Sequence, residues 1–227
     1  YKYLWSGFSN SLLITVVGTA IAVAVTICCA YALSINHRLR GVMLGVCMFT
    51  MYFDGGLIPN YLWIRDLGLF NTIWALVLPG ALSVYNMLVM RTYFQNSIPR
   101  ELREAAQLDG ASELQYLVRI VIPLSGAVIA VVTLYYASSL WNSYFNAMLY
   151  IRDMEKLPLS NILRSLLLTA QNAGMTTMDS LTAQKIEERE EVMKYCVIVV
   201  STFPMMLLYP FIQKYFVRGV MIGAVKG

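Results

Sequence analysis

The sequence has 227 residues, of which 58% are hydrophobic and only 13% are charged, whereas about 25% of residues are charged in an average soluble domain. Several charge-free stretches reach about 20 residues, which is the length of a helix that crosses roughly 30 Å of hydrocarbon, so the composition excludes an ordinary water-soluble domain. The net charge of +4 is small, nothing in its distribution resembles a nucleic-acid-binding surface, and the four cysteines have no zinc-site spacing, so we expect no metal site.

The first two predicted membrane spans differ in what interrupts them. Residues 11–34 carry no charge, so we expect a single helix there. Residues 41–64 contain Asp54, Gly55, Gly56 and Pro59, so this span should bend or partly unwind in its second half. Because a carboxylate is costly at membrane depth, Asp54 is either a functional group or a hydrated residue at the outer mouth of the protein.

Three further spans complete the predicted fold, which is an all-α polytopic membrane protein with five visible spans. Residues 71–93 are broken by Pro79 and Gly80. Residues 120–149 are charge-free for longer than a bilayer requires, which implies tilt or a helical extension at one end. Residues 195–217 contain two prolines and are the last predicted span.

Basic residues set the predicted orientation. Five spans place the two termini on opposite sides. The short loop of one side holds only Arg65, whereas the loops of the other side hold nine cationic side chains: Arg38, Arg40, Arg91, Arg100, Arg103, Arg119, Lys214, Arg218 and Lys226. By the positive-inside rule this set, and with it the C-terminus, is cytoplasmic. The segment at residues 151–194 is therefore external, and within it we predict helices at residues 159–168 and 183–194 joined by a loop at residues 171–180.

The cytoplasmic loop at residues 98–119 is predicted to form two short helices. Pro99 suits the first turn of a helix, and Glu104 lies near the positive end of its dipole. Gly110 can end that helix because glycine adopts a positive φ without strain. A second helix can then begin near Ser112, which would make a compact helix-turn-helix element on the cytoplasmic face.

This loop resembles the shared loop of the transmembrane subunits of ABC importers, which reads Glu-Ala-Ala, three residues, Gly, nine residues, Ile, one residue, Leu-Pro. The matching residues are Glu104, Ala105, Ala106, Gly110, Ile120 and Pro123, and Ile122 replaces the leucine. The two alanines would leave a low surface that another protein can approach closely. The resemblance extends over essentially the whole chain, and Asp109 with residues 141–147 and 216–227 makes it closest to the second permease of complex-polysaccharide importers of Gram-positive bacteria.

The resemblance implies a type I ABC importer transmembrane domain in a bacterial plasma membrane. Such a permease forms a heterodimer with a second permease subunit and works with two ATPase subunits and an extracellular substrate-binding protein, with an oligosaccharide as cargo. Its loop sits in a cleft of the ATPase, where Glu104 would pair with a basic residue, and the external segment contacts the binding protein. Members usually have six spans, so the resemblance implies a first span before Tyr1.

Catalysis is expected to lie in other chains. The sequence has no phosphate-binding loop of the Gly-x-x-x-x-Gly-Lys-Ser/Thr type, so ATP and Mg would be bound by the partner ATPase, and this chain is expected to be neither an enzyme nor a cofactor-binding protein. An ion-coupled secondary sugar carrier is the alternative, but it needs several intramembrane ionisable residues and only Asp54 qualifies.

The fourth span supplies the candidates for the translocation path. Polar and aromatic residues recur there at spacings of three and four, which puts them on one helical stripe: Tyr135, Ser138, Ser139, Asn142, Phe145 and Asn146. Aromatic faces can stack on sugar rings and amides can bond hydroxyls, while the same side chains could instead join neighbouring helices. Asp54, Ser83 and Asn86 are further candidates for lining the path.

Overall fold

The structure is a computed structural model that describes residues 2–175, 192, 194–204 and 206–207. These residues contain helices and connections but no strand, which confirms the predicted all-α class. The α-helices in chain order are α1 (Lys2–Ser34), α2 (Arg40–Tyr52), α3 (Leu57–Asp66), α4 (Trp74–Val77), α5 (Val84–Ser97), α6 (Arg100–Leu108), α7 (Glu113–Tyr116), α8 (Ile122–Leu124), α9 (Gly126–Trp141), α10 (Tyr144–Tyr150) and α11 (Leu159–Met175). A further helix occupies Lys194–Pro204.

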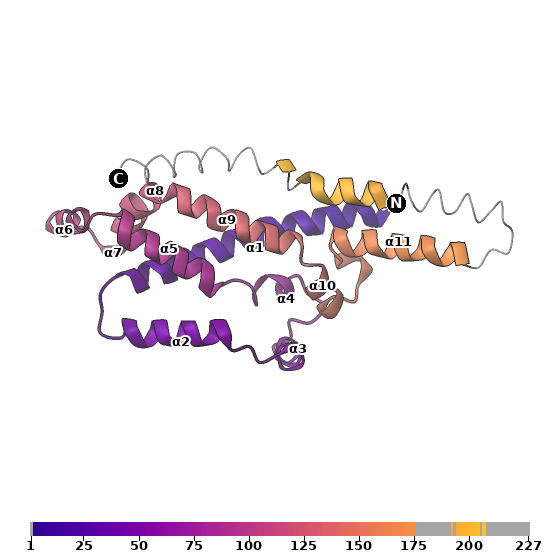
Figure 1. Cartoon of the computed structure of the whole chain (residues 1–227), viewed down its shortest axis with the longest axis horizontal. Helices are drawn as coiled ribbons and strands as arrows, with labels where there is room; N and C mark the ends of the chain where they lie inside the picture. Colours follow the sequence, from indigo (N-terminus) through magenta and orange to yellow (C-terminus); the bar gives the residue numbers. More distant parts are fainter. Residues whose placement is uncertain (1, 176–191, 193, 205, 208–227) are drawn as a thin grey trace.

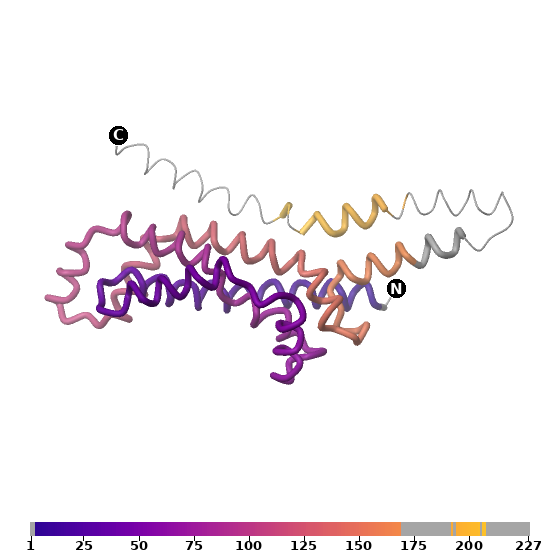
Figure 2. Tube along the Cα trace, turned by 60° about the horizontal axis from the view of Figure 1, so that its bottom comes forward, coloured from indigo at the N-terminus to yellow at the C-terminus, as the bar shows by residue number. Residues whose placement is uncertain are grey.

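Helices α1, α5 and α9 lie side by side along the long axis of the molecule and enclose its main core (Figures 1 and 2). The short helices α6 and α7 lie at one end, here called the α6 end, together with the α1–α2 connection. Helices α3, α4 and α10 lie toward the other end, here called the α10 end. The last carbonyls of α1 are satisfied at the α6 end, because Arg91 donates to the Leu33 oxygen at 2.9 Å and Gln95 donates to the Ser34 oxygen at 3.0 Å.

Helix α1 begins at Lys2, nine residues before the start predicted for the first span. Its 33 residues rise about 50 Å, well beyond the thickness of a hydrocarbon core. The added turns are held by tertiary contacts, since Asn10 donates to the Glu155 carbonyl at 2.7 Å and Ser11 accepts from the Leu159 amide at 2.8 Å. A boundary drawn from apolarity alone therefore started the helix too late, whereas its end at Ser34 is as predicted.

The predicted bend in the second span is present. Helix α2 ends at Tyr52, α3 begins at Leu57, and their axes differ by 113°. Gly56 has a φ of +91°, which glycine adopts without strain. Asp54 accepts hydrogen bonds of 3.1 Å from the Gly56 amide and from the Asn60 side chain, so its carboxylate organises the start of α3.

The third and fourth predicted spans are each divided. Residues 78–83, which include Pro79 and Gly80, separate α4 from α5. In the fourth, the chain turns by 84° between α8 and α9 and is interrupted again at residues 142–143. Tilt or extension of one long helix is thus wrong for residues 120–149. Pro123 lacks an amide proton near the first turn, and at the second interruption Asn142 donates from its side chain to the Ser138 carbonyl at 2.8 Å.

Among the described residues, the helix at Tyr3–Ser34 is long and apolar enough by itself to cross a membrane, and the number rises to three when each of two bent pairs is taken as one span. The fifth predicted span, residues 195–217, lies partly outside the described residues. Of the predicted helix at residues 183–194, only residues 192 and 194 are described. Helix α11 continues to Met175, so the loop predicted from residue 171 is wrong over residues 171–175.

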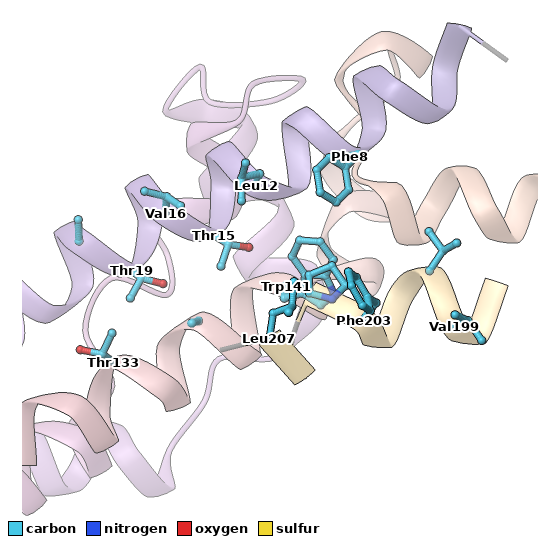
Figure 3. A pocket seen from close by; sticks show the side chains of 14 residues that line it. Phe8, Leu12, Thr15, Val16, Thr19, Thr133, Trp141, Val199, Phe203 and Leu207 are labelled. Atoms are coloured by element: carbon cyan, nitrogen blue, oxygen red, sulfur yellow. The ribbon is translucent and has the colours of Figure 1, made fainter. Parts of the chain in front are cut away.

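An apolar cavity of about 800 Å³ lies between α1, α9 and the helix at Lys194–Pro204 (Figure 3). Three threonines line it among otherwise apolar side chains, namely Thr15, Thr19 and Thr133. The indole nitrogen of Trp141 donates to the Ser201 carbonyl at 2.9 Å and ties the late helix to α9. The walls of the cavity are mostly apolar, so they would bind a hydrocarbon chain better than a polyhydroxyl ligand. This cavity is therefore not a candidate for sugar passage.

Candidate functional site

The loop at residues 98–119 folds as the two predicted helices, separated by a sharp reversal. Pro99 is the N-cap of α6, directly before the first helical residue. Gly110 has a φ of +75°, its amide donates to the Gln107 carbonyl at 3.0 Å, and the Ala111 amide donates to the Ala106 carbonyl at 2.9 Å. This is the Schellman pattern of helix termination, which needs a left-handed residue, and glycine supplies it.

Helix α7 starts where the sequence predicts, at Ser112. The Ser112 hydroxyl accepts from the Gln115 amide at 3.3 Å, and the Gln115 side chain accepts from the Ser112 amide at 2.9 Å, so the two residues form a capping box. The chain then passes through one π-helical turn at Leu117–Val121, which contains Ile120. Such turns are rare and often lie at functional sites.

The motif residues divide between an outer and an inner face of this loop. Glu104, Ala105, Asp109, Gly110 and Pro123 are exposed. Ala106, by contrast, is only 7% exposed and packs in the main core, and the half-buried Ile120 packs against the same core. The expectation that both alanines form an outer surface is therefore wrong for Ala106. Successive residues of a helix are about 100° apart, so α6 can pack on the core through Ala106 while Ala105 stays exposed.

Leu108 was missed by sequence reasoning and is the most exposed of the large hydrophobic residues described, at 90%. It lies four residues after Glu104 and therefore on the same side of α6. Leu114, at the start of α7, is 69% exposed. An apolar side chain on the polar face of a short amphipathic helix is the signal that identifies such a residue. Glu104, Ala105 and Leu108 are all exposed and make the outer face of α6, a mixed acidic and apolar surface.

Glu113 joins the loop to the bundle, and sequence reasoning gave it no role. The Tyr31 hydroxyl of α1 donates a short hydrogen bond to its carboxylate, and Arg103 of α6 pairs with it at 2.7 Å. The side chain of Gln107 also donates to it, at 3.5 Å. We call Tyr31, Arg103 and Glu113 the Glu113 latch. It links α1, α6 and α7 through one carboxylate.

The contacts within the latch shift the pKa values of Glu113 and Arg103 in the directions that favour their charged forms. The hydroxyl of Tyr31 and then the guanidinium of Arg103 hold the pKa of Glu113 below its ordinary value of 4.5. The hydrogen bond that Arg103 donates to Glu113 raises the pKa of Arg103. Both directions favour an ion pair at neutral pH.

A polar cavity of about 590 Å³ separates α6 from the ends of α1 and α5. Arg40, Arg100 and Arg103 line it together with Glu104 and Gln107. Helix α6 is thus not packed flush on the bundle along its whole length. The buried Ala106 and the Glu113 latch are the points at which it is attached.

The translocation-path candidates are brought together only in part. Ser139 and Asn146 line one cavity at the α10 end. Tyr135 and Phe145 are each 50% exposed, and Asn142 is exposed but donates to its own helix. The remaining candidates have other places in the fold: Asp54 is exposed in the α2–α3 connection, Ser83 is the N-cap of α5, and Asn86 is buried at 6% exposure.

Comparison with known proteins identifies the fold. Residues 4–222 match the family described as binding-protein-dependent transport system inner membrane component. The chain belongs to this family. It is a permease subunit of an ABC importer, embedded in a membrane, and permease subunits of this kind are not themselves enzymes. Its function implies a partner permease, an ATPase and a substrate-binding protein.

Individual relatives match over the whole of this chain. Protein LplC of Bacillus subtilis is 42% identical over all of this chain and 78% of its own length. The polygalacturonan/rhamnogalacturonan transport system permease protein YtcP, also of Bacillus subtilis, is 38% identical over all of this chain and 81% of its own length. A crystal structure of a bacterial ABC transporter involved in the import of the acidic polysaccharide alginate superposes with a TM-score of 0.82, at 35% identity, covering 95% of this chain and 76% of that one.

The α10 end of the permease is organised by Asn71. Its φ is +60°, in the left-handed region that asparagine tolerates better than most residues. Its amide donates to the Tyr150 carbonyl at 2.8 Å, and its side-chain oxygen accepts from the Arg152 and Asp153 amides at 3.0 and 3.1 Å. Lys156 pairs with Asp153 at 2.8 Å beside it. Asn71 thus fastens the connection before α4 to the segment that follows α10.

Proposed function

We propose that this permease moves an oligosaccharide or a polysaccharide fragment across the plasma membrane, as a heterodimer with a second permease and driven by two ATPase subunits. The named substrates of relatives support the class of cargo, since one relative transports polygalacturonan or rhamnogalacturonan and a structural neighbour belongs to an alginate importer. No observation favours an ion-coupled carrier, and Asp54, on which that alternative depended, is exposed and bonded to Asn60.

The observation that carries the proposal is the outer face of α6. Glu104 offers a carboxylate for a basic ATPase residue, Ala105 allows close approach, and the exposed Leu108 offers apolar surface that a partner would cover. In this proposal ATP and Mg are bound by the ATPase. Closure of its dimer displaces α6, and the Glu113 latch passes that displacement to α1, which runs the length of the bundle.

We propose further that the α6 end is cytoplasmic and that the C-terminus lies on the same side. Arg38, Arg40, Arg100 and Arg103 lie in the connections at this end or in its helices, which the positive-inside rule favours. The α10 end then faces outward, and the segment from Arg152 onward contacts the substrate-binding protein.

Glu104→Arg tests the coupling role. In the reconstituted complex this change should leave assembly intact but lower the ATPase stimulation by loaded binding protein at least about tenfold, because like charges would face each other across the interface. Asp66→Arg is the control, since Asp66 is also an exposed carboxylate but ends α3, away from α6. Unchanged stimulation in Glu104→Arg, or an equal loss in the control, would contradict the proposed role.

A further inference from the structure

A cavity of about 510 Å³ lies at the α10 end, between α3, α4, α9 and α10. Its volume is within the roughly 300–1,000 Å³ range of small-molecule sites. Two of the helix interruptions meet at its wall. Leu78, Pro79 and Gly80 come from the α4–α5 interruption, and Ser143 comes from the α9–α10 interruption.

Interrupted helices have a restricted set of uses in a membrane protein. Backbone groups freed from a helix cannot be left facing lipid, so non-helical backbone at membrane depth is buried in protein or lines a water-filled cavity. In transporters, discontinuous helices often form the substrate site. The meeting of two interruptions at one cavity therefore marks it as a place where a polar molecule can stay.

The polar side chains of the cavity can both donate and accept hydrogen bonds. Ser143 is 9% exposed, and its buried hydroxyl has no hydrogen-bond partner among the described residues. Asn60, Ser139 and Asn146 line the same space and are exposed to it or to solvent. A buried hydroxyl without a partner costs free energy, which a bound hydroxyl group would recover.

Tyr136 also lines the cavity, but its hydroxyl is already engaged in hydrogen bonds within the protein. Its hydroxyl is already bonded to Thr26 at 2.7 Å and accepts from the Ser83 amide at 2.9 Å. These bonds fix α9 against α1 and against the start of α5. The polar groups on α9 are thereby held in place, and Ser139 lies three residues further along.

The remaining lining gives the cavity an aromatic and uncharged character. Trp63 lines it and is 67% exposed, and Tyr150 lines it and is buried. Aromatic faces attract the weakly positive C–H groups of a sugar ring. None of the described residues that line this cavity is charged, so it offers no counter-ion to a carboxylate.

We propose that this cavity is a saccharide subsite that takes a neutral sugar unit of the cargo, with Ser143 and Asn146 bonding its hydroxyls and Trp63 stacking on its ring. The inference rests on the proposed function and adds that this subunit, and not only its partner permease, contacts the cargo. Acidic units of a polysaccharide would bind elsewhere, where cations can pair with them.

The subsite is tested by equilibrium binding to the purified, reconstituted complex, with quenching of tryptophan fluorescence as the signal and Trp63→Phe as the control for its origin. The probes are neutral arabinotriose and acidic trigalacturonate. Arabinotriose should bind at least about tenfold more tightly than trigalacturonate. Ser143→Ala should weaken its binding about fivefold, as expected for one lost hydrogen bond.

Ser125→Ala is the matched control, because the Ser125 hydroxyl is also buried without a partner but lies at the bend between α8 and α9. Gly80→Trp should block the cavity and abolish binding, since a Cβ at Gly80 meets only open space, whereas Gly45→Trp, equally unhindered on α2, should not. Absence of arabinotriose binding, tighter binding of trigalacturonate, or equal affinities in Ser143→Ala and wild type would overturn the subsite. ATPase stimulation that still depends on Glu104 in the same preparations would show that the proposed function stands without it.

Discussion

Glu113 shows how one residue can connect the loop at residues 98–119 to the rest of the permease. Its carboxylate binds Tyr31, which is 82 positions away in the sequence, as well as Arg103 on the neighbouring helix. A glutamate at the start of a short helix usually serves only the helix dipole. Its role as a link between helices depends on a tertiary contact, so the sequence could not have indicated it.

The latch predicts a pH dependence of stability. A carboxyl whose pKa is lowered in the folded state contributes stability that is complete above its ordinary pKa, near 4.5 for Glu113, and that is lost as the pH falls through the lowered value. The thermal stability of wild type in detergent should therefore exceed that of Glu113→Gln at pH 7, and the difference should shrink below about pH 4.5.

Because the Glu113 side chain is 49% exposed, the difference at pH 7 should not exceed about 1 kcal/mol. Tyr31→Phe removes one hydrogen-bond donor to Glu113 but keeps the carboxylate and its pair with Arg103. The stability of Tyr31→Phe at pH 7 should therefore lie between those of wild type and Glu113→Gln. A gap between wild type and Glu113→Gln that stays constant from pH 7 to pH 3.5 would rule out the latch as its source.

The two alanines of the motif mark the limit of residue-level prediction. The sequence indicates a loop that docks another protein, but only the structure separates Ala105, which faces outward, from Ala106, which packs in the core. The orientation of a short helix depends on where it is anchored. Here the anchors are Ala106 and the Glu113 latch, and neither has a signature in the local sequence.

At the scale of elements, helix ends with local causes were predictable. Gly110 ends α6, Ser112 starts α7, and residues 53–56 separate α2 from α3 because glycine, serine and aspartate act on the backbone within a few residues. The start of α1 and the interruption at residues 142–143 were not predicted. The first depends on contacts with residues 155–159, and the second on two polar residues that composition alone does not distinguish from helical neighbours.

The absence of a side chain at Gly18 allows α1 to approach α9 and α4 closely. A Cβ at this position would lie 2.7 Å from a Leu140 methyl group and 3.3 Å from a Val77 methyl group. Gly18→Leu should therefore force α1 away from α9 and α4 and destabilise the permease by about 1–3 kcal/mol. Thermal unfolding in detergent measures this loss.

Gly45→Leu is the control for that change, because a Cβ at Gly45 meets nothing within 4 Å. Its effect should stay within about 0.5 kcal/mol, as for an exposed site. Equal melting temperatures for the two variants would show that the close approach at Gly18 contributes nothing to stability.

At the scale of the whole molecule, the two-helix fold of the loop at residues 98–119 could be predicted because the loop is contiguous, whereas the lining of the proposed saccharide subsite could not. Ser139 and Asn146 were candidates from their spacing on one helix. Trp63 and Asn60 joined them only when α3 folded against α9 and α10. A site assembled from four helices has no single sequence pattern, and Tyr135 and Phe145 show that a shared stripe does not ensure a shared cavity.

The placement of α6 and of the α3–α4 connection at opposite ends predicts opposite accessibility in cells. Leu108→Cys should resist a membrane-impermeant thiol reagent in intact cells, whereas Leu67→Cys, which replaces a residue that is 54% exposed, should react. Both changes are made after the native cysteines are replaced by serine, namely Cys28, Cys29, Cys47 and Cys196. Labelling at Leu108→Cys without lysis would reverse the proposed orientation.

The central position of α1 also constrains the order in which the helices of the permease can pack during synthesis. Helix α1 leaves the ribosome before α9, yet Thr26, which is fully buried, finds its hydrogen-bond partner on Tyr136, 110 residues later. Lipid can cover the apolar faces of α1 during that interval, but it cannot satisfy the hydroxyls of Ser11 and Thr26. Synthesis must therefore pass α9 and reach Leu159 before these two hydroxyls of α1 have their partners, and a chain cut short before that point leaves α1 without them.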